Sequence, residues 1–228
     1  MLNDFISLFY PNVCVSCGNS LFGHEKEICS HCFVNLPKSG FHTDGQNPVA
    51  KLFHGRVDIL MAGSYYLFSK TGNVQKILHQ LKYKGNREVG ITIGKWYGDD
   101  LKEVKGFNDA DMILPVPLHK NRLKKRGYNQ STCFGLGLSQ SMKIEMREDL
   151  LIRRKETQTQ TRKSRFDRWE NVSEKFELRN AEGLRNKHVI LIDDVITTGA
   201  TLEACAQELK KAEGVKVSIA TIAYAQQV

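Results

Sequence analysis

The sequence predicts an α/β protein in which a parallel sheet is covered by helices on both faces, preceded by a small cysteine-rich unit. Three observations lead to this prediction. Short apolar runs alternate with stretches of helical periodicity from about residue 58 onward, and buried parallel strands have this continuous apolar character. Four of the six cysteines lie within the first 32 residues. A polar, turn-rich stretch then separates the two parts.

The composition is that of an ordinary globular protein. Of the 228 residues, 41% are hydrophobic and 25% are charged. No apolar run approaches the roughly 20 residues that span a bilayer. The first ten residues lack the basic start of a secretory signal. We therefore expect a cytoplasmic protein without a membrane span.

The four N-terminal cysteines form two CxxC pairs. Eleven residues separate the first pair from the second, a spacing that suits a tetrahedral zinc site. Disulfides fit poorly without a secretory signal, and a redox motif needs no second copy. A site filled by four thiolates has no position for a substrate, so the zinc is expected to be structural and to stabilise a ribbon over residues 1–45. Its predicted ligands are Cys14, Cys17, Cys29 and Cys32.

The second unit is expected over residues 49–228. Between Pro37 and Pro48 the chain is polar and rich in turn-forming residues, which is typical of a linker. Cys133 and Cys205 fall in apolar, helix-like stretches and are expected in the core.

The elements of this unit are expected in the order strand, helix, strand, helix, strand, strand, helix, strand, where the first segment forms one or two strands. The first helix is indicated by Val74, Ile77 and Leu81, which share one helical face with Leu78. The approximate ranges are residues 58–68, 74–81, 111–118, 129–142, 144–152, 188–194, 199–213 and 215–225.

A candidate ligand site follows the strand at residues 188–194. The strand ends in Asp193 and Asp194, and a hydroxyl-rich turn, residues 197–201, opens onto a helix. In a parallel sheet, ligands bind beyond the carboxyl ends of the strands, and a helix N-terminus favours a phosphate. The carboxylates suit the vicinal hydroxyls of a sugar, or magnesium. A ribose 5-phosphate fits this pattern, although Asp and Thr also serve as simple helix caps.

The positive charge is concentrated in the middle of the chain. The net charge is +8, and residues 119–168 carry 14 of the basic residues but 5 of the acidic ones. Such a stretch can contact phosphates on a small ligand or on nucleic acid. It is also what a solvated surface loop looks like, so charge alone leaves both interpretations open.

Several segments resemble known families. Residues 188–202 resemble, almost residue for residue, the ribose-phosphate signature of type I phosphoribosyltransferases. A second resemblance covers nearly the whole chain, through the CxxC pairs, residues 81–85, 115–130 and 154–160, and Arg168 and Asn171. These segments resemble the ComF family of competence-associated proteins, in which a zinc ribbon precedes a transferase-like domain. Tyr128 departs from the family pattern at a position where its members often have Phe.

The resemblance implies a type I phosphoribosyltransferase-like fold that binds 5-phosphoribosyl-1-pyrophosphate (PRPP) with magnesium. Asp193 and Asp194 would hold the ribose hydroxyls. The pyrophosphate would be bound by magnesium with Lys120, Arg122 or Arg126. The 5-phosphate would be bound by Thr197, Thr198, Gly199, Ala200 and Thr201. A closing loop that excludes water would supply the catalytic residues Arg154, Thr157 and Gln160.

Three functions remain open at this stage. The first is an active transferase that moves ribose 5-phosphate to an unidentified nitrogen acceptor; no general base is expected, because electrostatic stabilisation carries most of this chemistry. The second is a competence factor for natural transformation that binds single-stranded DNA beside a helicase partner. The third is a regulator that senses PRPP without turnover. Aromatic residues within or near the basic stretch offer stacking faces for the second function, although Phe134 is expected in the core: Tyr128, Phe134, Phe166 and Trp169.

Overall fold

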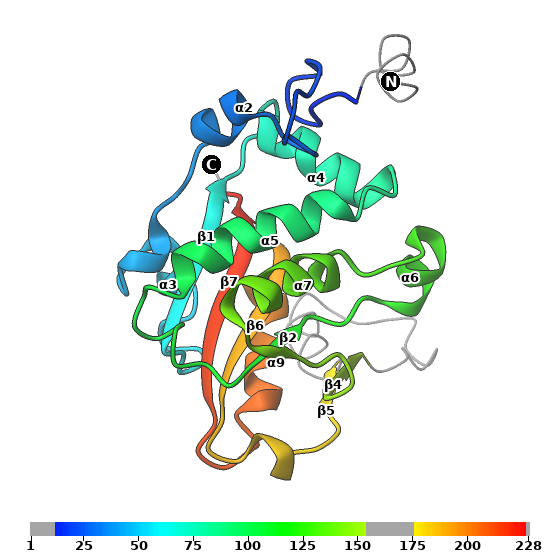
Figure 1. Ribbon diagram of the computed structural model, residues 1–228. Coiled ribbons are helices and arrows are strands. Elements are labelled where there is room, and N and C mark those ends of the chain that lie inside the picture. Colours follow the sequence, from blue (N-terminus) through cyan, green and yellow to red (C-terminus); the bar gives the residue numbers. More distant parts are fainter. Residues whose placement is uncertain (1–11, 154–175, 227–228) are drawn as a thin grey trace, which may run out of the picture.

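The computed structural model describes residues 12–153 and 176–226 (Figure 1). Its main sheet has five parallel strands in the order β1-β7-β6-β2-β3. The prediction of a parallel α/β sheet is confirmed. The strands are β1 (Met61–Leu67), β2 (Met112–Pro115), β3 (Glu145–Met146), β6 (His188–Ile196) and β7 (Lys216–Tyr224).

Helices cover both faces of this sheet. Alternate residues of β6 belong to different cores: Ile190 and Ile192 pack on one face, Val189 and Leu191 on the other. This alternation follows from the two-residue period of a strand. None of the helices among the described residues is long and apolar enough to cross a membrane. One face is covered by α4 (Asn73–Tyr83), α5 (Glu88–Leu101) and α7 (Gln130–Met142), the other by α3 (Pro48–Lys51) and α9 (Ala200–Leu209).

The cysteine-rich unit packs directly on the larger one. Cys14, Cys29 and Cys32 belong to the same buried cluster as residues of β1 and α4. Helix α2 (Ser30–Asn35) contributes Phe33, whose ring centroid lies 4.5 Å from that of Trp96 on α5. The unit therefore shares its apolar core with the sheet domain.

The stretch expected to be a linker is held against β1. It contains the short 3-10 helix η1 (Phe41–Thr43), and the backbone of Lys38 forms an isolated antiparallel β-bridge with that of Tyr66. The buried Asn47 amide donates to the Ala62 carbonyl oxygen at 2.7 Å, and the side-chain oxygen of Asn47 caps α3. A few side-chain hydrogen bonds thus order a segment whose polar composition is typical of a linker.

The single strand predicted over residues 144–152 is wrong. It divides into β3 and β4 (Leu151–Arg153), and β4 pairs antiparallel with β5 (Phe176–Leu178) in a separate two-stranded sheet. The polar residues Arg147 and Asp149, joined by an ion pair at 2.7 Å, form the bend between the two strands. Other short elements were not expected, among them α6 (Lys120–Arg126) and η2 (Glu182–Leu184).

Helix α5 was also not expected, and its glycines explain why. Glycine lowers helix propensity, but here it permits close packing of α5 on α7. A Cβ atom on Gly94 would lie 2.1 Å from the Phe134 carbonyl oxygen, and one on Gly137 would lie 2.1 Å from the Ile91 carbonyl oxygen. The two helices approach so closely only because these positions have no side chain.

Candidate functional site

Three elements meet around the two adjacent acids near the carboxyl end of β6. Asp193 Oδ1 accepts a hydrogen bond from Ser131 Oγ at 2.9 Å and another from the Asp194 backbone N–H at 2.8 Å. Ser131 lies in the first turn of α7. Asp194 Oδ2 lies 3.0 Å from Lys82 Nζ, which α4 supplies. The structure therefore gives each acid its own partner from a different helix.

The environment of Asp193 favours its protonated form. Burial and the neighbouring Asp194 raise the pKa of Asp193 to about 7, although hydrogen bonds from the Asp194 backbone N–H and Ser131 and the charge of Lys82 lower it in part. Asp194 is meanwhile paired with Lys82. Near neutral pH, the site thus carries less negative charge than two free carboxylates would.

The turn after β6 has the geometry of an anion site. Gly199 has a φ of +77° and is the N-cap of α9; a Cβ atom there would lie 3.3 Å from the Phe53 ring. The N-cap Gly199 has no side chain, and the side-chain contact that the described residues offer to the start of this helix is a long one, from the Ala200 backbone N–H to Thr198 Oγ1 at 3.4 Å. Thr197, Thr198 and Thr201 are exposed. Backbone amides and threonine hydroxyls at the start of α9 are therefore available to an anion.

Asp193 and the N-terminus of α9 line one cavity. It has a volume of about 50 Å³, and its walls include Asp193 together with residues 195–202. The structure thus brings together, at a single place, Asp193 and the turn residues that the sequence singles out. It does so because β6 runs directly into α9.

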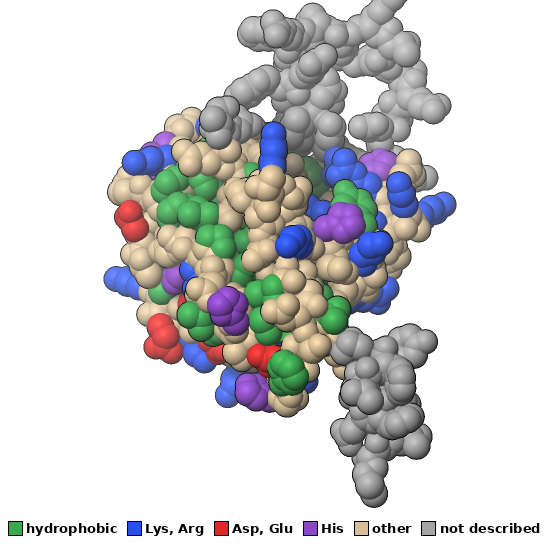
Figure 2. Space-filling view, turned by 90° about the horizontal axis from the view of Figure 1, so that it is seen from above, with side chains coloured by type: hydrophobic (Ala, Val, Ile, Leu, Met, Phe, Trp, Pro, Cys, Tyr) green, Lys and Arg blue, Asp and Glu red, His purple; other side chains and the backbone are tan. Residues whose placement is uncertain are grey.

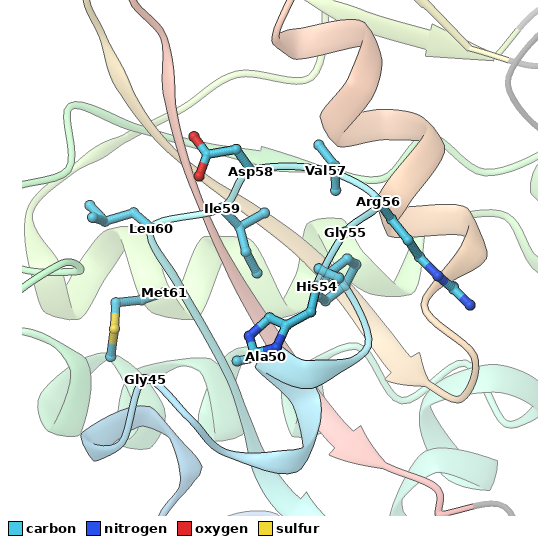
Figure 3. Close-up of a pocket in the computed structure, with 11 residues that line it drawn as sticks. Gly45, Ala50, His54, Gly55, Arg56, Val57, Asp58, Ile59, Leu60 and Met61 are labelled. Atoms are coloured by element: carbon cyan, nitrogen blue, oxygen red, sulfur yellow. The ribbon is translucent and has the colours of Figure 1, made fainter.

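Arg56 is a neighbour of this site that the sequence did not indicate. Its Nη1 lies 3.5 Å from the Thr198 carbonyl oxygen and 3.3 Å from Glu203 Oε2. Figure 3 shows Arg56 extending toward α9 from the loop of residues 54–61, which curves around a larger cavity of about 500 Å³. Among the described residues, the two cavities share no lining residue. The larger cavity is therefore separate from the acids.

The predicted pyrophosphate residues all lie on α6. Lys120 and Arg122 are exposed. Arg126 Nη1 donates to Gln130 Oε1 at 2.6 Å, and its guanidinium lies 5.5 Å from the Tyr83 ring centroid. The described contacts of the acids are instead to Lys82 and Ser131. A role for α6 in binding pyrophosphate stays a prediction.

Two of the four aromatic residues proposed to stack on DNA are buried. Phe134 lies in the core between α5 and α7, as expected. The proposal is wrong for Tyr128: its side chain is buried, its hydroxyl donates to the Leu81 carbonyl oxygen, and Arg87 covers its ring at 4.7 Å. Packing of the α6–α7 connection on α4 takes this ring away from solvent. Other predicted residues fall outside the described residues: Arg154, Thr157, Gln160, Phe166, Arg168, Trp169 and Asn171.

The four cysteines of the CxxC pairs converge as a metal site requires. Their sulfur atoms all lie within 4.8 Å of one another. Cys17 Sγ lies 3.8 Å from Cys29 Sγ, which is also the edge, about 3.8 Å, of a tetrahedron with zinc–sulfur bonds of about 2.3 Å. Backbone N–H groups approach two of the sulfurs, from Cys29 to Cys14 at 3.3 Å and from Cys32 to Cys29 at 3.5 Å. The donor set fits a structural zinc ion.

Comparison with known proteins extends these observations. Residues 131–227 match the family described as phosphoribosyl transferase domain. The chain is 35% identical over 113 residues to Competence protein F of Haemophilus influenzae, covering 49% of each chain. It is 29% identical over 136 residues to DNA utilization protein YhgH of Escherichia coli O157:H7, covering 58% of this chain and 59% of that protein. The chain thus spans about half to three fifths of these two relatives.

A third relative aligns over most of the chain. Competence protein ComFC of Bacillus subtilis is 26% identical over 215 residues, which cover 92% of this chain and 83% of that protein. Among solved structures, the glutamine PRPP amidotransferase of Bacillus subtilis complexed with ADP and GMP matches with a TM-score of 0.41 and 20% identity. That match covers 62% of this chain and 30% of the other.

Proposed function

We propose that this chain, which belongs to the ComF family and carries a phosphoribosyl transferase domain, binds PRPP at the end of β6. The observation that carries the proposal is the cavity shared by Asp193 and the start of α9, whose N-cap Gly199 has no side chain. A ribose 5-phosphate presents vicinal hydroxyls and a phosphate a few bonds apart. Carboxylates accept hydrogen bonds from such hydroxyls, and a helix N-terminus binds the phosphate.

We further propose that the bound donor reacts. A nitrogen nucleophile attacks C1 of the ribose, the C1–oxygen bond to pyrophosphate breaks, and the nucleophile gives up a proton to water or to the leaving group. Positive charge develops on the ribose ring during this displacement. The acids near the end of β6 hold the ribose hydroxyls, and the negative charge that they retain stabilises this positive charge electrostatically. Magnesium, when bound with the donor, neutralises pyrophosphate charge, and Lys120, Arg122 and Arg126 are the proposed protein cations beside it.

Turnover distinguishes a transferase from a sensor. Pyrophosphate release would be measured with PRPP, magnesium and a panel of nucleobases and amines, using the wild type and an Asp193→Ala, Asp194→Ala double variant. A transferase releases pyrophosphate with at least one acceptor, and the double variant does not. Donor binding without release for any member of the panel would contradict catalysis and favour a regulator that senses PRPP.

A second function, binding of single-stranded DNA, is favoured by one surface of the structure. Residues 70–87 and 112–144 contain eleven Lys and Arg but no Asp or Glu. The structure joins these two segments: Arg126 lies over Tyr83, and Arg87 Nη2 donates to the Gly127 carbonyl oxygen at 3.3 Å. Figure 2 looks onto the end of the molecule where β1 and β7 finish, and basic side chains gather at the right of that view. Such a surface is complementary to a polyanion.

This second function is tested by removing the positive charge of α6. Replacing Arg122, Lys124, Lys125 and Arg126 with Ala should weaken oligonucleotide binding and reduce the slope of log K against log salt by up to about 3. The matched control replaces four exposed lysines elsewhere: Lys51, Lys95, Lys105 and Lys216. Equal affinity and equal salt slopes for the two quadruple variants would remove DNA binding by this surface. A helicase partner, as the family resemblance implies, is part of this same alternative.

A further inference from the structure

Lys82 forms an unusually sheltered ion pair. Its side chain is 22% exposed and that of Asp194 is 15% exposed. In every other ion pair among the described residues, at least one partner is 37% exposed or more. Exposed pairs contribute little free energy because water screens them. The Lys82–Asp194 pair is screened least, so its charges act most strongly on whatever binds beside them.

The backbone around Lys82 is fixed on both sides. Helix α4 buries Ile77, Leu78 and Leu81 in the core. The Leu81 carbonyl oxygen accepts the hydroxyl of the buried Tyr128, and the next side chain, Tyr83, lies under the guanidinium of Arg126. Anchors on either side of Lys82 limit the movement of its backbone. The backbone from which the Lys82 side chain reaches Asp194 is therefore already in place before a ligand arrives.

This placement addresses an electrostatic problem of the site. PRPP carries phosphate and pyrophosphate groups, whose negative charges are repelled by a carboxylate. Lys82 neutralises Asp194 before any ligand or divalent cation is bound. An Asp194 oxygen not engaged by the ammonium remains free to accept a ribose hydroxyl, because an ionised carboxylate has about four acceptor positions.

We propose that Lys82 is a positioning residue that holds Asp194 for the ribose and supplies a resident positive charge, which lowers the need for magnesium in binding an anionic phosphoribosyl donor. This inference rests on the proposed function. It assigns to α4, far from β6 in sequence, part of the donor site.

The test measures the affinity of the full-length, zinc-loaded protein for PRPP by calorimetry, from buffer without added magnesium to saturating magnesium, and no chelator is used. Lys82→Met should weaken binding about tenfold or more at low magnesium, the size expected for loss of a charge-assisted contact. High magnesium should restore much of this loss. Lys82→Arg should bind like the wild type. Lys76→Met, which changes an exposed lysine of the same helix, should have no effect.

Each other result is informative. Equal affinity of the wild type and Lys82→Met at every magnesium concentration would overturn the inference. A loss that is the same at all magnesium concentrations would also overturn it, because it would indicate a structural role only. Lys82→Gln and circular dichroism guard against misfolding of the Met variant. If the wild type itself does not bind PRPP, the proposed function fails instead, so the two failures are distinguishable.

Discussion

Asp193 and Asp194 are neighbours in sequence but have different surroundings. Asp193 is held by Ser131 and by the backbone of Asp194, and its pKa is raised to about 7 by burial and by the adjacent acid. Asp194 is paired with Lys82. An acid that binds its proton more tightly in the folded state than in the unfolded state destabilises the fold when it ionises. Ionisation of Asp193 therefore lowers the stability of the fold at neutral and alkaline pH.

Asp193→Asn should reveal this cost. Because the folded pKa lies above the ordinary value of 3.8, the wild type loses stability as pH rises from about 4 through about 7. Asn cannot ionise and still accepts the hydrogen bond from Ser131. We expect the variant to gain stability over the wild type between pH 5 and pH 8, on the order of 2 kcal/mol at the upper end. Thermal unfolding at both pH values measures this gain.

The control for this experiment is an acid with the opposite shift. Arg147 lowers the pKa of the exposed Asp149 to about 2. Asp149→Asn should therefore give no gain in stability as pH rises over the same range. A difference between Asp193→Asn and the wild type that does not change with pH would contradict the raised pKa of Asp193.

Among single residues, the sequence pattern singled out Asp193, Asp194 and the turn at residues 197–201, but not the side chains that contact them. Asp193, Asp194 and residues 197–201 stand in one continuous motif, so local pattern was enough to single them out. Lys82, Ser131 and Arg56 come from other segments of the chain. Their contacts depend on how α4, α7 and the loop after α3 pack on the sheet, which no local pattern encodes.

Among the elements, α5 and α7 depend on glycine. We expect Gly94→Ala to destabilise the protein by about 1–3 kcal/mol or more, because its Cβ atom would lie 2.1 Å from the Phe134 carbonyl oxygen and force the helices apart. Urea unfolding measures the loss. Gly45→Ala is the control, since the nearest atom to its Cβ would be 3.6 Å away. Equal stability of the two variants would show that the close helix contact is unimportant.

The elements also show where periodicity fails as a predictor. Helix α4 was predicted because Val74, Ile77 and Leu81 form a simple apolar face, and all three are buried. Helix α5 escaped prediction because glycines occupy its packing face. Glycines at its interior positions allow close packing on α7 but have low helix propensity, so the sequence pattern resembles that of a loop.

The cysteine unit gives a prediction at the same scale. Cys29→Ser should reduce bound zinc well below one equivalent, because it removes one of four thiolates. Phe33 packs on Trp96, so the fluorescence of Trp96 should change as the unit loosens. Metal analysis of the purified variant is the primary measurement. Retention of one full equivalent of zinc would contradict a site made of the four cysteines.

Across the whole molecule, α4 connects the two candidate sites. Its N-terminal half contributes Gln75 and Lys76 to a groove of about 760 Å³ against the first CxxC pair, and its other end carries Lys82 to Asp194. The sequence placed these parts in two units joined by a linker. The shared core shows why composition could not reveal the contact: polar linkers and polar packed segments look alike until their hydrogen bonds are known.

This connection predicts an effect of metal removal at a distance. Stripping zinc with a chelator should loosen the packing of the cysteine unit on α4. Because the other end of α4 carries Lys82, this loosening should weaken PRPP binding several-fold. The experiment restores zinc afterwards, and affinity should return with it. Magnesium is kept saturating throughout, so that chelation acts only through zinc. Unchanged affinity in the zinc-free protein would show that the two sites are independent.

We propose above that the end of β6 and the start of α9 form a PRPP site. Calorimetric titration of the purified protein with magnesium and PRPP at physiological salt tests it most directly. We expect saturable binding near one equivalent, and we expect it to be lost in an Asp193→Ala, Asp194→Ala variant that stays folded. Absence of binding at millimolar PRPP, or undiminished binding by the folded double variant, would contradict it.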